Sequence, residues 1–447
     1  MTDPQDDLDL LDRVIAQAKA AGAEAADALL VHSVSLSYAQ RLGQLERLER
    51  DESNDLGLRV LIGRRQAIVS SSDRSPGALN DLVERAVAMA RVVPEDPHCG
   101  LAAPGQLAKK QPELDICDAS EPSPETLIER AAACEEAARA VTGITNSEGA
   151  EAGWSLGRVT LAASNGFAGS YASSGHSLGV AVVAGEGLGM ERDYDFSSAV
   201  HGGDLDDPAE VGRRAGERTV KRLGARKAAT GKVPVVLDPR VSNGLLRHLA
   251  GAINGIAVAR GTSFLKDKLG ERIFPERVTI VDDPHRPRGL RSKPFDGEGV
   301  ANGRLAVVEE GRLATWILDL ASARQLGLKT TGRAARGTSS PPSPATTNLY
   351  MEAGGVSPAE LMADIKSGFY VTEMMGMGVN GVTGDYSRGA AGFWIENGEL
   401  AYPVSELTVA GNLKDMFLKI TPADDLVFRY GANAPTLRIE GMTVAGA

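Results

Sequence analysis

The sequence predicts an α+β fold, in which a mixed region of helices and strands precedes a mostly antiparallel, barrel-like C-terminal domain with one helix packed on it. Three observations lead to this prediction. The 447 residues are too many for one ordinary hydrophobic core. Six prolines between residues 93 and 124 interrupt regular structure. Strand and hairpin patterns dominate from residue 232 to the end. We therefore expect three domains, over residues 1–110, 111–230 and 231–447.

The first domain is predicted to be a helix, several strands and a second helix. Apolar side chains recur at helical spacing over residues 6–21, and Gly22 is a natural helix end. Short β-like runs follow, among them "VSLSYAQ", whose alternation is typical of a half-buried strand. A further apolar stripe predicts a helix over residues 76–92.

The second domain is predicted to contain two helices with long strands between them. The run "PETLIERAAACEEAARAV" starts with Pro124, and proline is favoured in the first turn of a helix. The "SNG" at residues 164–166 is a turn signal between two strand-like segments. A second helix is expected at about residues 207–224, followed by the basic spacer "GARKAATGK".

The C-terminal domain carries the clearest β signals. Hairpin turns are predicted at Glu310-Gly311 and at Asn397-Gly398, each between apolar alternations. Glycine accounts for 51 of the 447 residues, above the usual ~7%, which suits tightly turned β structure. The run "ARGTSSPPSPATTNLY" is expected to be an extended loop that enters a strand near Asn348.

Composition narrows the functional class. A hydrophobic content of 43% and a charged content of 24% are those of a soluble globular protein. The net charge of −11 argues against direct nucleic-acid binding, which needs clustered lysine and arginine. No apolar run approaches the roughly 20 residues of a membrane span, and the N-terminus is acidic where a secretory signal would be basic. Three cysteines show no metal-ligand spacing. We therefore expect a cytoplasmic protein without a membrane or nucleic-acid partner.

The helix that opens the C-terminal domain lacks the residues of a zinc site. A zinc protease would place two histidines and a glutamate on such a helix, but "SNGLLRHLAGAINGIAVARGTSF" at residues 242–264 contains only His248 and no acidic residue. One imidazole cannot hold zinc, which needs three or four ligands. An alternative is that His248 converges in space with His285 and with Asp282 or Asp283 of the run "VDDPH".

Other catalytic motifs are absent or incomplete. In "GEGLGM" the third glycine position is Met190, and no apolar helix follows to bind a dinucleotide phosphate. The sequence contains no GxxxxGK[ST] loop and no GxSxG elbow.

Two polar clusters are the candidate substrate contacts. Thr347 and Asn348 lie at a predicted strand entrance, and Asp385, Ser387 and Arg388 lie in a glycine-flanked loop. A strand edge beside flexible glycines could accept an extended peptide by strand addition. The other interpretation of both segments is a turn-rich barrel corner.

Long runs of the chain resemble the TldD/PmbA family, and specifically its PmbA (TldE) branch. The matching runs are "RGTSFLKDKLGERIF", "PFDGEGV", "TTNLYMEAG", "VNGVTGDYSRGAAGFWIENGELAYPVSELTVAGNLKDMF" and "PTLRIEGMTV". The resemblance covers nearly the whole chain. It implies a subunit of a paired cytoplasmic peptidase that acts on unfolded peptides, in a family also associated with modulation of DNA gyrase.

The resemblance also implies where a metal site would lie. In the TldD subunit, zinc is bound by a His-Glu-x-x-x-His helix and by a cysteine near the C-terminus. The run "RGTS" aligns that motif with Leu246, Arg247 and Gly251, and no cysteine follows Cys134. We therefore expect no catalytic residue, no cofactor and no metal in this chain, with zinc carried by a TldD-type partner.

Three functions follow as hypotheses. The first is a non-catalytic subunit that pairs through its β-rich domain with a zinc-bearing TldD-type paralogue, or with itself in isolation, and encloses unfolded peptides. The second is a metallopeptidase or hydrolase active in its own right. The third is a regulatory binding protein that modulates DNA gyrase.

Overall fold

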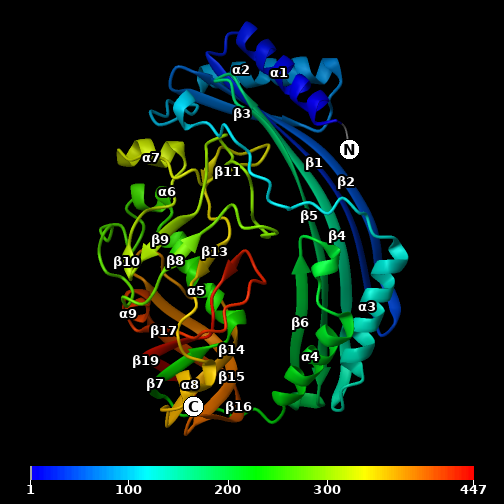
Figure 1. Ribbon diagram of the computed structural model, residues 1–447, viewed down its shortest axis with the longest axis vertical. Helices are drawn as coiled ribbons and strands as arrows, with labels where there is room; N and C mark the ends of the chain where they lie inside the picture. Colours follow the sequence, from blue (N-terminus) through cyan, green and yellow to red (C-terminus); the bar gives the residue numbers. More distant parts are fainter. Residues whose placement is uncertain (1–2, 447) are drawn as a thin grey trace.

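The N-terminal half is organised by one long antiparallel sheet. The computed structural model describes residues 3–446, and Figure 1 shows this sheet curving along one side of the molecule. The strand order is β3-β2-β1-β4-β5-β6, and every pairing is antiparallel. Its strands are β1 (Ala25–Arg41), β2 (Gln44–Ile62), β3 (Arg65–Ser71), β4 (Ile144–Ala163), β5 (Ala168–Ala184) and β6 (Glu191–Ala199). Because β1 pairs with β4, the sheet is continuous across the boundary predicted at residue 110, and the three-domain division stays a prediction.

Four helices cover one face of this sheet. They are α1 (Pro4–Ala20), α2 (Pro76–Val92), α3 (Pro124–Arg139) and α4 (Pro208–Lys221). Each begins with an aspartate or serine N-cap followed by proline, which satisfies a free amide and presets the first helical turn. The predicted helices are thus confirmed, with ends that differ by a few residues. Alternate residues of β1 point toward them, with Leu30 among the α1 and α2 core residues and Leu36 among those of α3 and α4.

The opposite face of the sheet packs on the C-terminal region. Phe295 lies edge-on against Phe167 at 5.0 Å between ring centroids, in a cluster with Leu29 and Leu161. At Gly57 a Cβ atom would lie 2.0 Å from the backbone oxygen of Thr338, so the two parts of the chain touch there without a side chain between them.

A closed five-stranded barrel forms the C-terminal end of the chain, as predicted. The order β16-β15-β14-β7-β19 closes through a further pairing of β19 with β16, and β17 (Ile420–Pro422) extends the edge of β19. Only the β7–β14 pairing is parallel among these strands. The barrel strands are β7 (Gly231–Leu237), β14 (Ser367–Met375), β15 (Asp385–Glu396), β16 (Glu399–Asn412) and β19 (Leu437–Ala445).

A second, five-stranded sheet lies beside the barrel, in the order β10-β9-β8-β13-β18. It consists of β8 (Ile280–Asp282), β9 (Leu305–Glu309), β10 (Arg312–Leu313), β13 (Leu349–Met351) and β18 (Ala432–Asn433). Helix α5 (Pro239–Ala252) shares one core with both sheets, which confirms the predicted helix packed on the β domain. The remaining short elements are α6 (Gly255–Ala259), α7 (Leu320–Leu326), α8 (Pro358–Met362), α9 (Leu413–Leu418), β11 (Ala334–Ala335) and β12 (Ser343–Pro344).

The two hairpin turns predicted from the sequence are confirmed, and both are formed by residues with positive φ. Glu310 and Gly311 have φ of 47° and 77°, and Asn397 and Gly398 have φ of 51° and 86°. Two successive positive φ values define the hairpin turn that matches strand twist. The proline-rich segment contains no helix or strand apart from one short 3₁₀ turn at Pro104–Gln106. Within residues 3–446, no helix is both long and apolar enough to cross a membrane.

Candidate functional site

Helix α5 packs its apolar face against the core. Its outward face carries few large side chains. Asp238 caps its first turn by accepting a hydrogen bond from the Arg240 amide at 2.9 Å. The side chains at helical spacing that point inward are Leu245, Leu246, Leu249 and Ala252. The outward face holds Arg247 and Gly251, with His248 half-buried at the margin.

The three positions aligned with the zinc motif do not form a metal-binding set. Leu246 is 1% exposed and belongs to the C-terminal core. Arg247 donates to the side-chain oxygen of Asn243 at 2.8 Å, and an added Cβ at Gly251 would meet open space. None of these positions offers an imidazole, a carboxylate or a thiolate, which are the groups that bind zinc. The residues present therefore do not fit a zinc ion.

His248 lies beside one aromatic ring and near two arginines. Its ring meets that of Tyr386 edge-on, with centroids 5.9 Å apart. Burial lowers the pKa of His248, and the nearby positive charges of Arg388 and Arg247 lower it further, so the imidazole is neutral at pH 7. Its Nε2 is buried without a hydrogen-bond partner among the described residues. Over the same part of the chain, no three His, Cys, Asp or Glu side chains cluster as a metal site would require.

The residues of the alternative hydrolase site each have partners of their own. Asp282 is fully buried and ion-paired with Arg333. The ring of His285 is hydrogen-bonded to Asn302 at 2.7 Å, while Asp283 accepts from the backbone amide of His285 at 2.9 Å. These contacts are all separate from those of His248 described above.

The first polar cluster of the sequence is embedded in the fold. Thr347 donates to Asp282 through its amide at 2.6 Å and its hydroxyl at 2.9 Å. Asn348 donates to the Asp283 carbonyl at 2.7 Å and to the Ser292 hydroxyl at 2.8 Å. Both side chains are at most 2% exposed, although Asn348 reaches the wall of a cavity of about 180 Å³. Their role as substrate contacts stays a prediction.

The second polar cluster lies at a different cavity. Asp385 and Ser387 line an open hollow of about 640 Å³ at the start of β15. Hydrogen bonds from Thr383 and from Asn412 lower the pKa of Asp385 and hold its carboxylate in the ionised form. Arg388 contacts the Met374 carbonyl at 3.4 Å. The two predicted clusters therefore do not form one site.

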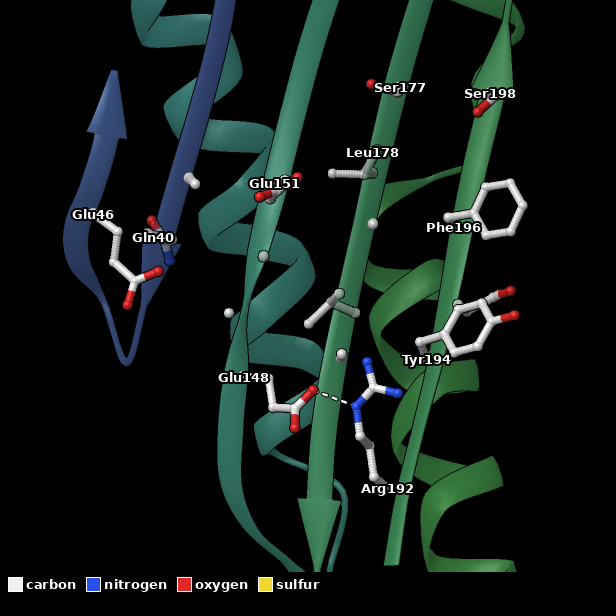
Figure 2. A pocket seen from close by; sticks show the side chains of 17 residues that line it. Gln40, Glu46, Glu148, Glu151, Ser177, Leu178, Arg192, Tyr194, Phe196 and Ser198 are labelled. Atoms are coloured by element: carbon white, nitrogen blue, oxygen red, sulfur yellow. Dashed lines mark hydrogen bonds and ion pairs between the residues drawn. The ribbon is translucent and has the colours of Figure 1, made fainter. Parts of the chain in front are cut away.

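A hollow on the helix-free face of the N-terminal sheet was not predicted from the sequence. It measures about 450 Å³, and Figure 2 shows Tyr194, Phe196 and Ser198 of β6 projecting on the side away from the helices. Arg192 and Glu148 form an ion pair at one end of it. Phe196 also meets Tyr430 of the C-terminal region, with centroids 5.4 Å apart. The hollow therefore lies where the sheet faces the C-terminal half.

The floor beside this hollow carries almost no large side chains. Glycine and serine alternate on the same face of β4 and β5, in the cross-strand pairs Gly153–Ser177, Ser155–Gly175 and Gly157–Ser173. Three serines of β1 continue the pattern, Ser33, Ser35 and Ser37. Such a floor offers hydroxyl groups without long side chains. The runs "SVSLS", "GWSLG" and "SSGHS" contain this period-two signal, from which the floor could have been predicted.

Arg286 was also not predicted from the sequence as a site residue. Its guanidinium lies 3.3 Å from the ring centroid of Phe428, in the cavity that Asn348 and Tyr430 also line. Burial lowers the pKa of Arg286, and the nearby carboxylate of Asp283 partly offsets this effect. An arginine fixed on an aromatic ring and facing a cavity can bind a carboxylate.

Comparisons with known proteins agree with this architecture. Three family profiles match in succession: PmbA/TldA metallopeptidase domain 1 at residues 26–90, the central domain at 117–223 and the C-terminal domain at 230–446. Metalloprotease PmbA of Escherichia coli O157:H7 is 40% identical over 97% of this chain and 94% of that protein. A Metalloprotease PmbA homolog of Haemophilus influenzae is 36% identical over 92% of this chain and 90% of that protein.

Solved structures show the same fold. A candidate modulator of DNA gyrase from Bacteroides thetaiotaomicron has a TM-score of 0.91 and 30% identity, covering 98% of both chains. TldE from Thermococcus kodakarensis has a TM-score of 0.88, covering 98% of this chain and all of that chain, and at 21% identity it supports the fold alone. The fold and the three matching profiles are thus those of the PmbA/TldA metallopeptidase domains. The chain belongs to the PmbA/TldD family, which confirms the resemblance noted in its sequence.

Proposed function

We propose that this chain is the non-catalytic subunit of a cytoplasmic PmbA/TldD-type peptidase, in which a TldD-type paralogue supplies the zinc. The observation that carries the proposal is the position of α5. The helix aligned with the family's metal motif is present and packed, yet Leu246 is part of the core while Arg247 and Gly251 supply no ligand. An activated water needs a metal held by three protein ligands, and the three motif positions of this helix supply none.

The second part of the proposal concerns the peptide. The glycine–serine floor and the hollow beside Tyr194 and Phe196 form one wall of a chamber that admits unfolded chains. A floor of small residues leaves room for many peptide side chains, and the aromatic rings give apolar contacts without demanding one sequence. Arg286 would bind a peptide carboxylate at the cavity beside Phe428.

The test combines metal analysis with a peptidase assay. The purified chain is expected to contain no stoichiometric zinc and to leave an unfolded peptide intact. A zinc-bearing TldD-type partner is then added, and cleavage that a chelator abolishes is expected in the mixture. Chelator-sensitive cleavage by the lone chain would overturn the proposal, as would stoichiometric zinc in it.

The hydrolase alternative gains no support from the contacts of its proposed residues. Asp282 is fully buried against Arg333, and His285 is bonded to Asn302. Modulation of DNA gyrase is favoured by one specific observation, namely the description of the Bacteroides thetaiotaomicron relative at 30% identity. Co-purification with gyrase subunits, in the absence of a zinc-bearing paralogue, would support that second function.

A further inference from the structure

The long hairpin of β1 and β2 leaves one strand edge without a partner. Strand β3 pairs only with Leu56–Ile62 of β2, so residues 44–55 have β1 on one side and no strand on the other among the described residues. Every residue from 44 to 52 is exposed. Figure 1 shows β2 at the outer edge of the sheet. Such an edge carries unpaired backbone N–H and C=O groups that can bind another strand.

The sequence of this edge is complementary to itself. Residues 46–50 read Glu-Arg-Leu-Glu-Arg. When two copies run antiparallel about Leu48, Arg47 faces Glu49 and Glu46 faces Arg50, each twice. All four cross-strand charge pairs are therefore of opposite sign. Opposite charges on facing strands are favourable, and like charges there are unfavourable.

Apolar side chains accompany these charges. Leu42, Leu45 and Leu48 are 44%, 61% and 49% exposed, and Leu48 would meet its own copy at the centre of the pairing. Leu42 and Gly43 form the hairpin turn, with φ of 53° and 74°, so the turn holds the end of β2 in place. Exposed leucines on an unpaired strand are costly in a monomer and are buried by pairing.

The ion pairs that Arg47 and Arg50 form within one chain do not prevent the pairing of two copies. Arg47 lies 3.4 Å from Glu151, while Arg50 is ion-paired with Glu52 and lies 3.2 Å from Glu121. All five side chains are between 43% and 69% exposed. Ion pairs as exposed as these contribute little to stability, so the arginines are free to turn toward a second strand.

We propose that residues 44–52 are a self-association surface, on which a second copy of this chain adds the same segment antiparallel, centred on Leu48. The contact has two-fold symmetry, so each copy offers the same patch. It joins the two N-terminal sheets edge to edge and is separate from the α5 surface and from the C-terminal barrel. Nine paired residues span about 30 Å.

Two reciprocal charge reversals test the pairing. Glu46→Arg with Glu49→Arg makes all four charges of residues 46–50 positive, and Arg47→Glu with Arg50→Glu makes all four negative. Each double variant of the full chain is expected to weaken self-association at least about tenfold, because four attractive pairs become repulsive. A mixture of the two variants is expected to restore it, since positive then faces negative. Sedimentation equilibrium between about 1 and 100 μM measures both effects.

A matched control reverses two charges that are also three residues apart but lie in a different hairpin. Glu396→Arg with Glu399→Arg changes two exposed glutamates three residues apart in the β15–β16 hairpin and should leave self-association unchanged. Thermal unfolding checks that each variant folds. A wild-type chain that stays monomeric throughout, or dimers that neither reversal weakens, would overturn the proposal. So would loss of binding to a zinc-bearing paralogue with unchanged self-association, because the edge would then serve a different partner.

Discussion

The carboxylate of Asp282 lies against the guanidinium of Arg333, and both side chains are fully buried. Arg333 also donates to the Gly303 carbonyl at 2.6 Å, while Asp282 accepts from Thr347. The pair thus ties β8 to the entrance of β13 and to a loop more than fifty residues away. The first carboxylate of "VDDPH" is therefore used for folding, and its charge is balanced inside the core.

Replacing Arg333 by alanine should strongly destabilise the C-terminal region. The change leaves Asp282 as a buried and uncompensated charge, which costs about 3–5 kcal/mol of unfolding free energy. Urea unfolding followed by tryptophan fluorescence measures the loss. Arg304→Ala is the control, because Arg304 and its partner Glu352 are 54% and 45% exposed. That variant should lose no more than about 1 kcal/mol. Equal losses of unfolding free energy in the two variants would contradict a special contribution from the buried Asp282–Arg333 pair.

Glu298 should make stability fall as the pH rises. Burial raises the pKa of Glu298 to about 8 from an ordinary 4.5, and the negative charge of Asp296 adds to the effect. Because the folded pKa is the higher one, this contribution to stability is fully present below the unfolded pKa of 4.5 and is lost as the pH rises through about 8. The protonated form is thus the one that suits the core.

Glu298→Gln tests this dependence. The amide oxygen can still accept the Leu320 N–H bond that Glu298 accepts at 2.8 Å, but it carries no charge at any pH. The variant should gain at least about 1 kcal/mol over the wild type at about pH 9 and much less at about pH 5. Glu352→Gln, at an exposed position, should follow the wild-type curve. A parallel shift at both pH values would show that the charge of Glu298 is not responsible.

The parts of the fold that could be predicted from the sequence are those whose signals lie within a few neighbouring residues. Serine or aspartate followed by proline marks the start of each of the four N-terminal helices, because both residues act within the first turn. The Glu310-Gly311 and Asn397-Gly398 turns require positive φ, which those residue types tolerate. The pairing of β1 with β4 across more than a hundred residues has no local signature, so the continuous sheet was not foreseen.

The orientation of helix α5 at the candidate site could also be predicted, because helical periodicity is a local signal. Helical periodicity placed Leu245 and Leu249 inward and His248 at the margin, as the structure has them. The polarity of Thr347 and Asn348 suggested contacts with substrate, and the structure adds that both side chains bond to buried groups from distant segments. A sequence shows that a residue is polar but does not show which distant partner it meets.

Gly57→Ala should loosen the contact between the N-terminal sheet and the C-terminal region. The new methyl group would lie 2.0 Å from the Thr338 backbone oxygen, and a backbone cannot yield as a flexible side chain can. Overpacking of this kind costs about 1–3 kcal/mol, which thermal unfolding should show as a lower midpoint. Gly77→Ala is the control, since an added Cβ there meets nothing within 4 Å. A midpoint lowered equally by both changes would argue against a specific clash.

His248→Ala should leave the peptidase activity of the complex with a zinc-bearing partner within about twofold of the wild type. The imidazole is neutral, its Nε2 is buried, and its ring contact is to Tyr386, so no acid or base partner prepares it for proton transfer. Removing a general acid or base typically costs about 10²–10⁴-fold in rate. Measured kcat/KM on an unfolded peptide separates these outcomes. A hundredfold loss in a folded variant would make His248 part of the chemistry and would restore the hydrolase alternative, because the zinc of the partner would then not suffice.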